Sequence, residues 1–185
     1  MSNNALVLID IQNDYFEGGM WPVDKMQEVT ANAVRLLEHA RKHGYEIIHI
    51  RHEIPSQEAP FFRPGTTGAE THASVAPNEG ETVILKHKAN SFQDTSLGVE
   101  LEARGVSKIT ICGAMSQMCI DATTRAASDF GYEVTVVEDA CGAKEVMFND
   151  VEVPASQVHA AFMAPLAMSY ASVISCETYF SEDGR

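Results

Sequence analysis

The sequence is poor in basic side chains, with 13 lysines and arginines against 26 aspartates and glutamates among its 185 residues. The formal net charge is therefore −13 at pH 7 with neutral histidines. A surface of this sign repels phosphate backbones and anionic lipid headgroups, so nucleic acid and membranes are not expected as partners. We attribute the acidic excess to solubility and not to attraction of a cationic substrate.

Long hydrophobic runs are also absent, because no apolar stretch approaches the roughly 20 residues that span a bilayer. The first ten residues, MSNNALVLID, have neither the basic segment nor the small-residue cleavage pattern of a secretory signal. These two absences predict a cytoplasmic protein.

Cysteine is scarce and scattered, at Cys112, Cys119, Cys141 and Cys176, and no C-x-x-C pair occurs. This spacing argues against a zinc ribbon and a thioredoxin-like redox centre, and reduced thiols are expected. The G-x-G-x-x-G fingerprint of dinucleotide-binding folds does not follow the first apolar run either. These patterns predict no cofactor.

Short apolar runs rich in β-branched residues recur along the chain. We predict six strands from them, at residues 5–9, 46–50, 82–86, 108–112, 133–137 and 172–176. Several of these runs are apolar at consecutive positions, which is typical of strands that are buried on both faces of a parallel sheet. Helices are therefore expected on both sides of the sheet.

Helical patterns separate the predicted strands. The first helix has an apolar stripe and is predicted to begin at a cap on Asp24 and to end at Gly44. The second is predicted to begin after Thr95 or Ser96 and to end at Gly105.

Two more helical patterns lie in the second half of the chain. One is predicted to start at a cap on Ser116 and to end at Gly131. Its buried face is predicted to hold Ile120, Thr123, Ala127 and Phe130. The other covers residues 156–169 and is expected to be interrupted at Pro165.

The alternation of strands and helices predicts a three-layer α/β/α sandwich around a six-stranded, mainly parallel, doubly wound sheet. With 45% apolar side chains the chain is expected to form a single domain over residues 1–185. Ligands then bind at the carboxyl ends of the strands. The proline- and glycine-rich segment at about 52–81 is unusually long for a loop, and we expect it to form a wall or lid of the site.

Cys119 follows the fourth strand, at the first turn of the third helix. A helix start favours an anion, so this thiol is predicted to have a lowered pKa and to attack as a thiolate. The competing interpretation is a small buried hydrophobic residue. That packing role is favoured for Cys112 and Cys176 in their strands, and for Cys141 in the loop after the fifth strand.

Asp10 and Lys86 directly end the first and third strands. Taken alone, a strand-end aspartate is often a turn residue, and a strand-end lysine is often a solvated charge. Both nevertheless lie at the same sheet edge as Cys119, where a buried carboxylate and a buried ammonium would each need a partner. This convergence predicts a site for nucleophilic catalysis.

Three segments resemble the isochorismatase-like cysteine hydrolases, namely LVLIDIQNDY, VILKHKANSFQDTSL and ITICGAMSQMCIDATTRAASDFGYEVTVVEDAC. The resemblance runs from about residue 5 to 176, and that superfamily includes nicotinamidases and N-carbamoylsarcosine amidases. Through HKANSF and CIDATTRAA the chain looks most similar to the nicotinamidase-related group that contains streptothricin hydrolase.

The resemblance implies a catalytic triad of Asp10, Lys86 and Cys119. It also implies a non-proline cis peptide between Ala114 and Met115, with the backbone N–H groups of Met115 and Cys119 as the oxyanion hole. The implied reaction is hydrolysis of an amide, carbamoyl or lactam C–N bond through a thioester acyl-enzyme. Isochorismatases proper typically lack the cysteine, so its presence favours amide cleavage. By the same resemblance a homo-oligomer, a dimer or tetramer, is expected.

The chain departs from nicotinamidases at their metal triad, which has the form D-x-H with a later histidine. The matching stretch reads IRHEI, with His52 and Ile54 at the expected ligand positions. Because a carbon side chain cannot coordinate, no metal is predicted, although His72 with His52 and Glu53 would offer another ligand set. A metal-assisted nicotinamidase or pyrazinamidase is the alternative that a chelator would test.

Side chains in or beside loops are the candidates for contact with a small-molecule substrate. They are Gln12, Phe16, Trp21, Phe61, Phe62, Asn90 and Phe92. Aromatic residues are often part of the core, and Gln12 could instead orient Asp10 or lie on the surface. A catalytically silent binding or scaffold protein is the remaining alternative, because a fold alone does not establish a function.

Overall fold

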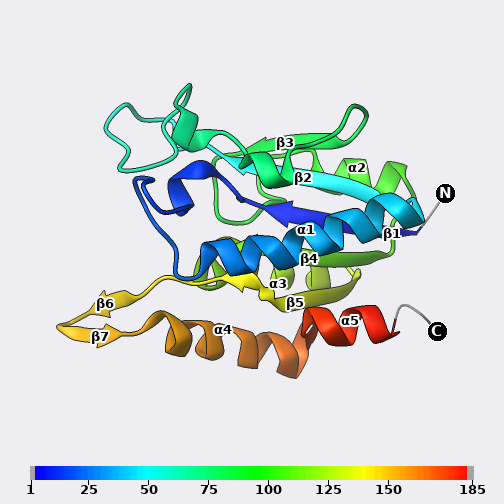
Figure 1. The fold of residues 1–185 in the computed structure, drawn as a ribbon. Helices are drawn as coiled ribbons and strands as arrows, with labels where there is room; N and C mark the ends of the chain where they lie inside the picture. The colour runs from blue at the N-terminus through cyan, green and yellow to red at the C-terminus, as the bar shows by residue number, and fades with distance from the viewer. Residues whose placement is uncertain (1–2, 183–185) are drawn as a thin grey trace.

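The computed structural model describes residues 3–182, which contain a six-stranded parallel sheet (Figure 1). Its strands are β1 (Asn4–Ile9), β2 (Glu46–His52), β3 (Thr82–Lys86), β4 (Lys108–Ala114), β5 (Glu133–Gly142) and β8 (Ser172–Ile174). They lie in the order β3-β2-β1-β4-β5-β8, and every adjacent pair is parallel. The predicted doubly wound sheet is confirmed, and it is parallel throughout.

The chain order reverses between β1 and β4 at the centre of the sheet. From β1 the chain adds β2 and β3 on one side, and then returns to place β4 on the other side. The connections that leave the carboxyl ends of β1 and β4 therefore diverge. This divergence opens the position at which such sheets bind their ligands.

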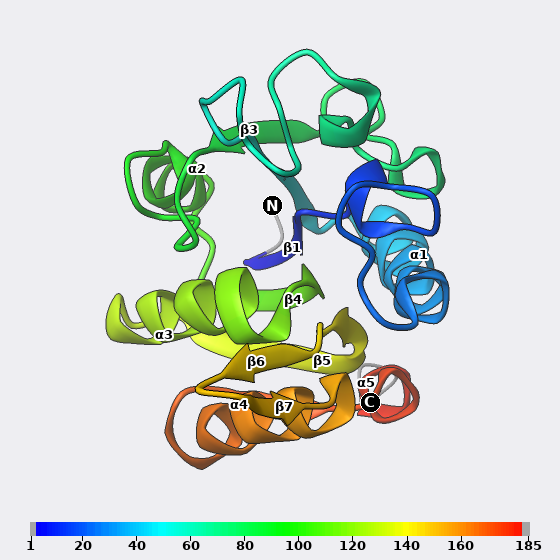
Figure 2. The same ribbon diagram turned by 90° about the vertical axis from the view of Figure 1, so that its left-hand side faces the viewer.

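Helices cover both faces of the sheet (Figure 2). One face carries α1 (Met26–His43) and α5 (Cys176–Glu182), and the other carries α2 (Leu97–Ala103), α3 (Asp121–Asp129) and α4 (Ala155–Ser169). Successive residues of β1 explain this arrangement, because Leu6 and Leu8 pack under α1 whereas Val7 and Ile9 pack under α2 and α3. The consecutive apolar residues thus mark a strand that is buried on both sides.

The start of α1 differs from the prediction. Lys25 is the N-cap residue, with a φ of 51°, and no side chain caps the helix there. The exposed Asp24 instead donates its backbone N–H to the Ala143 carbonyl at 3.2 Å, which joins the start of α1 to the end of β5. At the other end Gly44 terminates α1 in the left-handed conformation, as predicted.

The third predicted helix opens with a π-helical turn, η4 (Ser116–Ile120), that continues into α3. Ser116 does not cap it, because Met115 occupies the N-cap position and the Ser116 hydroxyl donates to the Gly142 carbonyl. Phe130 was wrongly placed on the buried face, since it follows the last helical residue and is 66% exposed.

Pro165 does not interrupt α4, contrary to the prediction. Proline has no N–H to donate to the carbonyl four residues earlier, which is that of Ala161. Because Ala161 is exposed, water can donate to this carbonyl instead. The helix is held against the rest of the protein by its buried side chains, Val158, Met163 and Leu166.

The chain beyond β5 contains three elements that the patterns did not predict, two strands and the helix α5. β6 (Val146–Phe148) and β7 (Val151–Val153) form an antiparallel hairpin that projects from the body of the protein (Figure 1). The last strand ends at Ile174, so Cys176, predicted to lie in that strand, begins α5.

Gly113 pairs with Ile9 where β4 runs beside β1. Its φ is +125°, and a Cβ at this position would lie 1.9 Å from the Ile9 carbonyl oxygen. The register between β4 and β5 also shifts between Ile111 and Gly113. Only glycine combines this backbone conformation with so close an approach, so Gly113 sets the separation of the two central strand ends.

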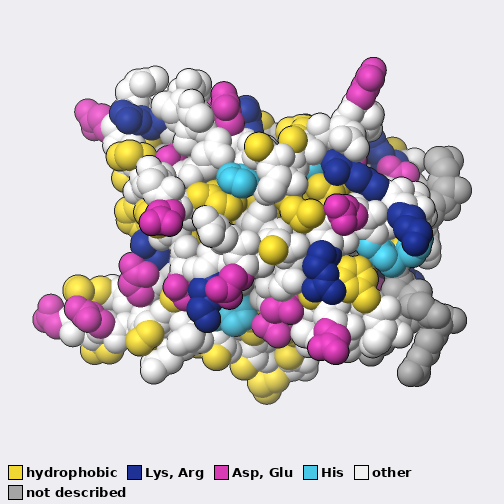
Figure 3. Space-filling view, in the orientation of Figure 1, with side chains coloured by type: hydrophobic (Ala, Val, Ile, Leu, Met, Phe, Trp, Pro, Cys, Tyr) yellow, Lys and Arg dark blue, Asp and Glu magenta, His cyan; other side chains and the backbone are white. Residues whose placement is uncertain are grey.

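The surface carries mixed charges and an apolar hairpin. On the face occupied by α1, acidic side chains are interspersed with basic ones (Figure 3). The exposed apolar side chains of the hairpin are Val146, Met147, Phe148 and Val151. Within the described part of the chain, none of the helices has the length and apolar character that a bilayer crossing needs.

Candidate active site

Asp10 directly follows β1, and its side chain is completely buried. Its backbone has a φ of 53°, which is uncommon for a residue other than glycine. Its N–H donates to the Ile50 carbonyl at 3.0 Å, so the turn after β1 is bonded to β2. This turn directs the carboxylate towards the end of β3.

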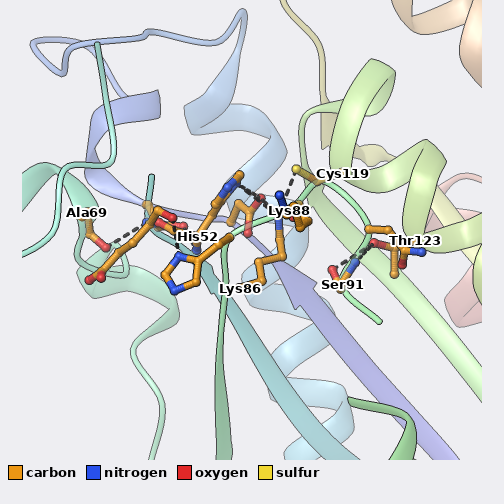
Figure 4. A network of polar contacts seen from close by, with 12 residues as sticks. His52, Ala69, Lys86, Lys88, Ser91, Cys119 and Thr123 are labelled. Atoms are coloured by element: carbon orange, nitrogen blue, oxygen red, sulfur yellow. Dashed lines mark hydrogen bonds and ion pairs between the residues drawn. The ribbon is translucent and has the colours of Figure 1, made fainter. Parts of the chain in front are cut away.

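The Lys86 side chain is the centre of the candidate site (Figure 4). Its Nζ lies 2.8 Å from Asp10 Oδ2 and 3.1 Å from Cys119 Sγ. It also donates to the Lys88 carbonyl at 3.0 Å and lies 3.3 Å from His52 Nδ1. The three N–H groups of the ammonium therefore have four neighbouring partners in the protein. Water does not contribute to this arrangement, because Lys86 is only 1% exposed.

The charges of Asp10 and Lys86 stabilise each other. Burial by itself would raise the pKa of Asp10, but the Lys86 ammonium and His52 outweigh it, so the pKa of this carboxyl lies below its ordinary value. Burial would likewise lower the pKa of Lys86, but the Asp10 carboxylate and Cys119 raise it above its ordinary value. The resting site therefore contains a carboxylate and an ammonium.

Cys119 completes the cluster and is 3% exposed. Burial and the Asp10 carboxylate raise the pKa of its thiol more than the Lys86 ammonium lowers it. The lowered pKa predicted from the helix start is therefore wrong for the resting site. The first physical reason is the burial of the thiol, and the second is that Asp10 already neutralises Lys86, so little positive charge is left to stabilise a thiolate.

The other three cysteines are free and buried. Burial raises the pKa of Cys112 to about 12, and it also raises the pKa of Cys176. Cys141 lies inside β5 and not in a loop after it, and burial raises the pKa of its thiol well above the ordinary value. These three thiols are packed in the core.

His52, considered from the sequence only as a possible metal ligand, is a direct neighbour of Asp10 and Lys86. It pairs with Lys86 in the register of β2 and β3, and its Nδ1 lies 3.7 Å from Asp10 Oδ2. The available signal was its place at the end of the second strand, but the predicted strand stopped at residue 50. With β2 extended by two residues, His52 joins the strand-end side chains that converge at this edge.

Gln12, a predicted substrate contact, holds the backbone of His52. Its Oε1 accepts from the His52 N–H at 2.7 Å, and its Nε2 donates to the His52 carbonyl at 2.8 Å. The same Nε2 donates to the Ala69 carbonyl at 2.8 Å (Figure 4). The amide of Gln12 therefore joins the end of β2 to the long segment at 53–81.

The segment at 53–81 folds against the loop that follows β1. It contains η2 (Thr67–Ala69) and η3 (Ala73–Val75). Asp14 in the loop after β1 binds this segment, because its Oδ2 accepts from the Phe62 N–H at 2.7 Å. A Cβ at Gly68 would lie 2.1 Å from the Asp14 carboxylate, so the contact is tight. The segment forms a fixed wall beside His52.

Aromatic side chains line this wall. Phe62 is completely buried, with its ring centre 4.5 Å from that of Tyr15 and 6.0 Å from that of His52. Phe61 stacks on Trp21 at 4.9 Å. Burial raises the pKa of Tyr15 well above its ordinary value, and the proximity of Cys119 and Asp10 raises it further. Three predicted contacts, Trp21, Phe61 and Phe62, thus form one cluster next to the site.

The other predicted contacts lie in separate clusters. Phe16 stacks on His72, with ring centres 3.8 Å apart. Asn90 Oδ1 accepts from the Phe92 N–H at 2.9 Å, and the Phe92 ring packs 5.1 Å from that of Phe130 beside a cavity of about 750 Å³. Phe92 also lies 6.2 Å from the Tyr132 ring, and it packs against the hydrophobic cluster that contains Cys119.

The turn after β4 carries the backbone groups implied by the resemblance. The peptide between Ala114 and Met115 is cis, as expected. Met115 precedes η4, and its carbonyl accepts from the N–H groups of Met118 and Ile120 at 3.0 and 3.2 Å. The segment from Met115 to Cys119 is therefore a compact turn at the end of the central strand.

The cluster does not suit the metal ion of nicotinamidases. Donor atoms of Asp10, His52 and Cys119 lie within 4.8 Å of one another, but Lys86 Nζ lies within 3.3 Å of all three residues. A divalent ion there would be repelled by this ammonium. Ile54 offers no donor, and His72 Nδ1 bonds to Ser74 Oγ at 2.7 Å beside Phe16 and away from this cluster.

Comparison with known proteins identifies the family to which the chain belongs. The Isochorismatase domain family matches residues 4–177. This chain belongs to the isochorismatase family. Among its relatives, the uncharacterized isochorismatase family protein YddQ of Bacillus subtilis is 46% identical over 175 residues, which cover 95% of this chain and 97% of the relative.

Two further isochorismatase-family comparisons bear on the fold and the class of enzyme. A solved protein of Oleispira antarctica, assigned to the isochorismatase hydrolases, has a TM-score of 0.94 and 47% identity, with 98% of each chain covered. Streptothricin hydrolase of Streptomyces noursei is 33% identical over 136 residues, which cover 74% of this chain and 48% of that hydrolase. The family and the fold predicted from the sequence are both confirmed.

Proposed function

We propose that this protein is a cysteine-dependent hydrolase that cleaves the C–N bond of a small amide, carbamoyl compound or lactam. The observation that carries the proposal is the position of Lys86 Nζ, which lies 2.8 Å from Asp10 Oδ2 and 3.1 Å from Cys119 Sγ at a buried sheet edge. A carboxylate, an ammonium and a thiol in mutual contact provide a base, a charge and a nucleophile. The similarity to streptothricin hydrolase supports the enzyme class.

In the first step the Cys119 sulfur attacks the substrate carbonyl carbon. Asp10 lies within hydrogen-bonding reach of the Cys119 thiol, so its carboxylate can accept the thiol proton as the bond forms. The carbonyl electron pair moves onto oxygen, and the N–H groups of Met115 and Cys119 are the proposed donors to this oxyanion. Lys86 stabilises the developing negative charge on sulfur.

In the second step the tetrahedral intermediate collapses and the C–N bond breaks. Asp10 gives its proton to the nitrogen as the C–N bond breaks, and a thioester forms on Cys119. The amine or ammonia then leaves, whereas the amine of a lactam stays attached to the acyl group. Water attacks the thioester carbonyl while Asp10 accepts a proton from it, and Asp10 passes this proton to sulfur as the C–S bond breaks and the acid product leaves. Asp10 thus acts as base and acid in turn.

The site favours a small, uncharged reacting group. Asp10, Lys86 and Cys119 are each at most 3% exposed, and the charges of Asp10 and Lys86 already compensate each other. A charged reacting group would therefore be desolvated without a partner. The partly buried Trp21 and Phe61 are the proposed apolar wall for the remainder of the substrate, and the completely buried Phe62 packs behind them.

The test is turnover by the purified protein of a panel of primary amides, carbamoyl compounds and lactams. We expect release of ammonia or amine, or the ring-opened amino acid from a lactam, and a mass increase on the peptide that contains Cys119 when the reaction is quenched early. Cys119→Ala should abolish both signals, and Cys176→Ala, which changes a buried thiol away from the triad, should leave both intact. Turnover retained by Cys119→Ala would exclude the proposed nucleophile.

The same experiment separates hydrolysis from a binding or scaffold role. A silent protein would give neither product nor acyl-enzyme with any member of the panel, although its fold remained intact by circular dichroism. That result would remove the proposed function.

A further inference from the structure

Ser116 is a buried hydroxyl that the proposed mechanism does not use. It is 0% exposed and lies between Met115 and Cys119 in the chain. Its Oγ donates to the Gly142 carbonyl at 3.1 Å and lies 2.9 Å from His159 Nδ1. The Ser116 side chain therefore contacts two other elements, the end of β5 and α4.

The direction of these hydrogen bonds follows from counting hydrogens. The Ser116 hydroxyl has one hydrogen, and the Gly142 carbonyl can only accept it. For the 2.9 Å contact to be a hydrogen bond as well, His159 must donate from Nδ1 to Ser116 Oγ. The arrangement that satisfies both contacts makes Ser116 an acceptor from α4 and a donor to β5.

The two ring nitrogens of His159 lie in different surroundings. Nδ1 faces the buried Ser116, whereas Nε2 lies 3.5 Å from Glu138 Oε2 beside a cavity of about 330 Å³. The side chains of His159 and Glu138 are 23% and 39% exposed, so solvent weakens the contact between them. The Nδ1 contact is thus the one that can fix the geometry of the turn.

We propose that His159 is a positioning residue for catalysis. Its Nδ1–H bond to Ser116 Oγ holds the segment from Met115 to Cys119, so that the backbone N–H groups of both residues face the substrate oxygen. The kinetic part of this inference rests on the proposed hydrolase function. Because an oxyanion forms only after attack, loss of this bond lowers kcat and leaves KM nearly unchanged.

Two substitutions of His159 separate its two contacts. His159→Asn places an amide nitrogen near the position of Nδ1 and loses the Glu138 contact, whereas His159→Gln reaches towards Glu138 and loses the Ser116 bond. We expect His159→Gln and His159→Ala to lower kcat by about tenfold or more, as small misplacements in active sites do. His159→Asn should retain most of the rate. Ser156→Ala, an exposed position one turn earlier on α4, is the matched control.

A second measurement does not depend on turnover. Protein labelled with ¹⁵N at methionine and cysteine reports the amides of Met115 and Cys119, the two proposed donors. These signals should shift in His159→Ala and His159→Gln and should stay in place in His159→Asn and Ser156→Ala. A melting temperature for each variant shows that the compared proteins are folded.

The outcomes decide the two proposals separately. If wild-type protein turns over no substrate, the hydrolase function fails, and the amide signals alone test the role of His159. Unmoved signals of Met115 and Cys119 in His159→Ala would overturn the positioning role, and so would equal losses in His159→Asn and His159→Gln. The positioning role is supported if the amide signals move and the rate falls only in the variants that lose the hydrogen bond to Ser116.

Discussion

The Lys86 ammonium lies 2.8 Å from the Asp10 carboxylate, and neither side chain reaches solvent. A buried ion pair adds little to stability relative to apolar residues, whereas the loss of one partner leaves an uncompensated charge in the core. The stability of the fold and the chemistry of the site therefore depend on the same pair, and substitution can separate the two effects.

Lys86→Met should destabilise the protein by about 3–5 kcal/mol, because it leaves the Asp10 carboxylate buried without its cation. Asp10→Asn in the same chain should recover much of this loss, since no buried charge then remains. Neither variant should turn over substrate. Urea unfolding of the two single variants and the double variant gives the coupling free energy, and additive losses would contradict a coupled pair.

Asp10→Asn should separate the reactivity of the thiol from turnover. The Asp10 carboxylate helps to raise the pKa of Cys119, so its removal should shift the pH profile of Cys119 alkylation by iodoacetamide to lower pH. Turnover should nevertheless be lost, because no group remains to carry the proton. Peptide mapping identifies the labelled thiol, and predominant labelling of Cys112, Cys141 or Cys176 would argue against the assignment of Cys119.

Removal of metal ions should leave turnover unchanged. The Lys86 ammonium lies within 3.3 Å of Asp10, Cys119 and His52, which form the candidate ligand cluster found among residues 3–182. The measurement is the rate at saturating substrate after dialysis against a strong chelator, with metal loss checked by elemental analysis. A large fall in rate that one divalent ion restores would favour the metal-assisted alternative.

Glu81 should make stability depend on acid pH. Its carboxylate bonds to Arg41 Nε at 2.7 Å and to His49 Nε2 at 2.9 Å, and these contacts with the Asn78 N–H outweigh burial and lower its pKa to about 2. The folded-state pKa is thus below the unfolded value of about 4.3, so the ionised group stabilises the fold above that pH.

Glu81→Gln should therefore reduce the free energy of unfolding at pH 7 by about 1–3 kcal/mol. The difference between wild type and variant should shrink as the pH falls from about 4.3 towards 2, where Glu81 becomes protonated in both states. Urea unfolding at several pH values measures this difference. A difference that stays constant over this range would show that Glu81 does not stabilise the fold through its charge.

The parts of the fold that were predictable are those in which local pattern and burial agree. All six strands of the large sheet have apolar runs, and α1 has a clear stripe and a terminal glycine. The hairpin of β6 and β7 was not predictable, because its apolar side chains are exposed and pack on no core. The course of α4 through Pro165 depends on tertiary packing, which a local rule does not include.

The candidate site was predictable to the extent that strand ends meet at one edge. Asp10 and Lys86 follow from that rule, but the place of His52 beside them was missed because the second strand is longer than its apolar run. The pKa of Cys119 could not be obtained from its helix position, because it depends on the burial of the thiol and on a carboxylate that is distant in sequence. The role of Gln12 is a backbone contact across 40 residues, and no local pattern contains it.

The close approach of β4 to β1 at Gly113 makes this glycine important for activity although it has no side chain. The spacing between the turns that bear Asp10 and Cys119 depends on a residue without a side chain, whose added methyl group would overlap the Ile9 carbonyl. An alanine scan confined to polar and aromatic positions would pass over it. Mutational libraries that include glycine positions would place Gly113 among the most sensitive sites in the protein, although it donates nothing to the substrate.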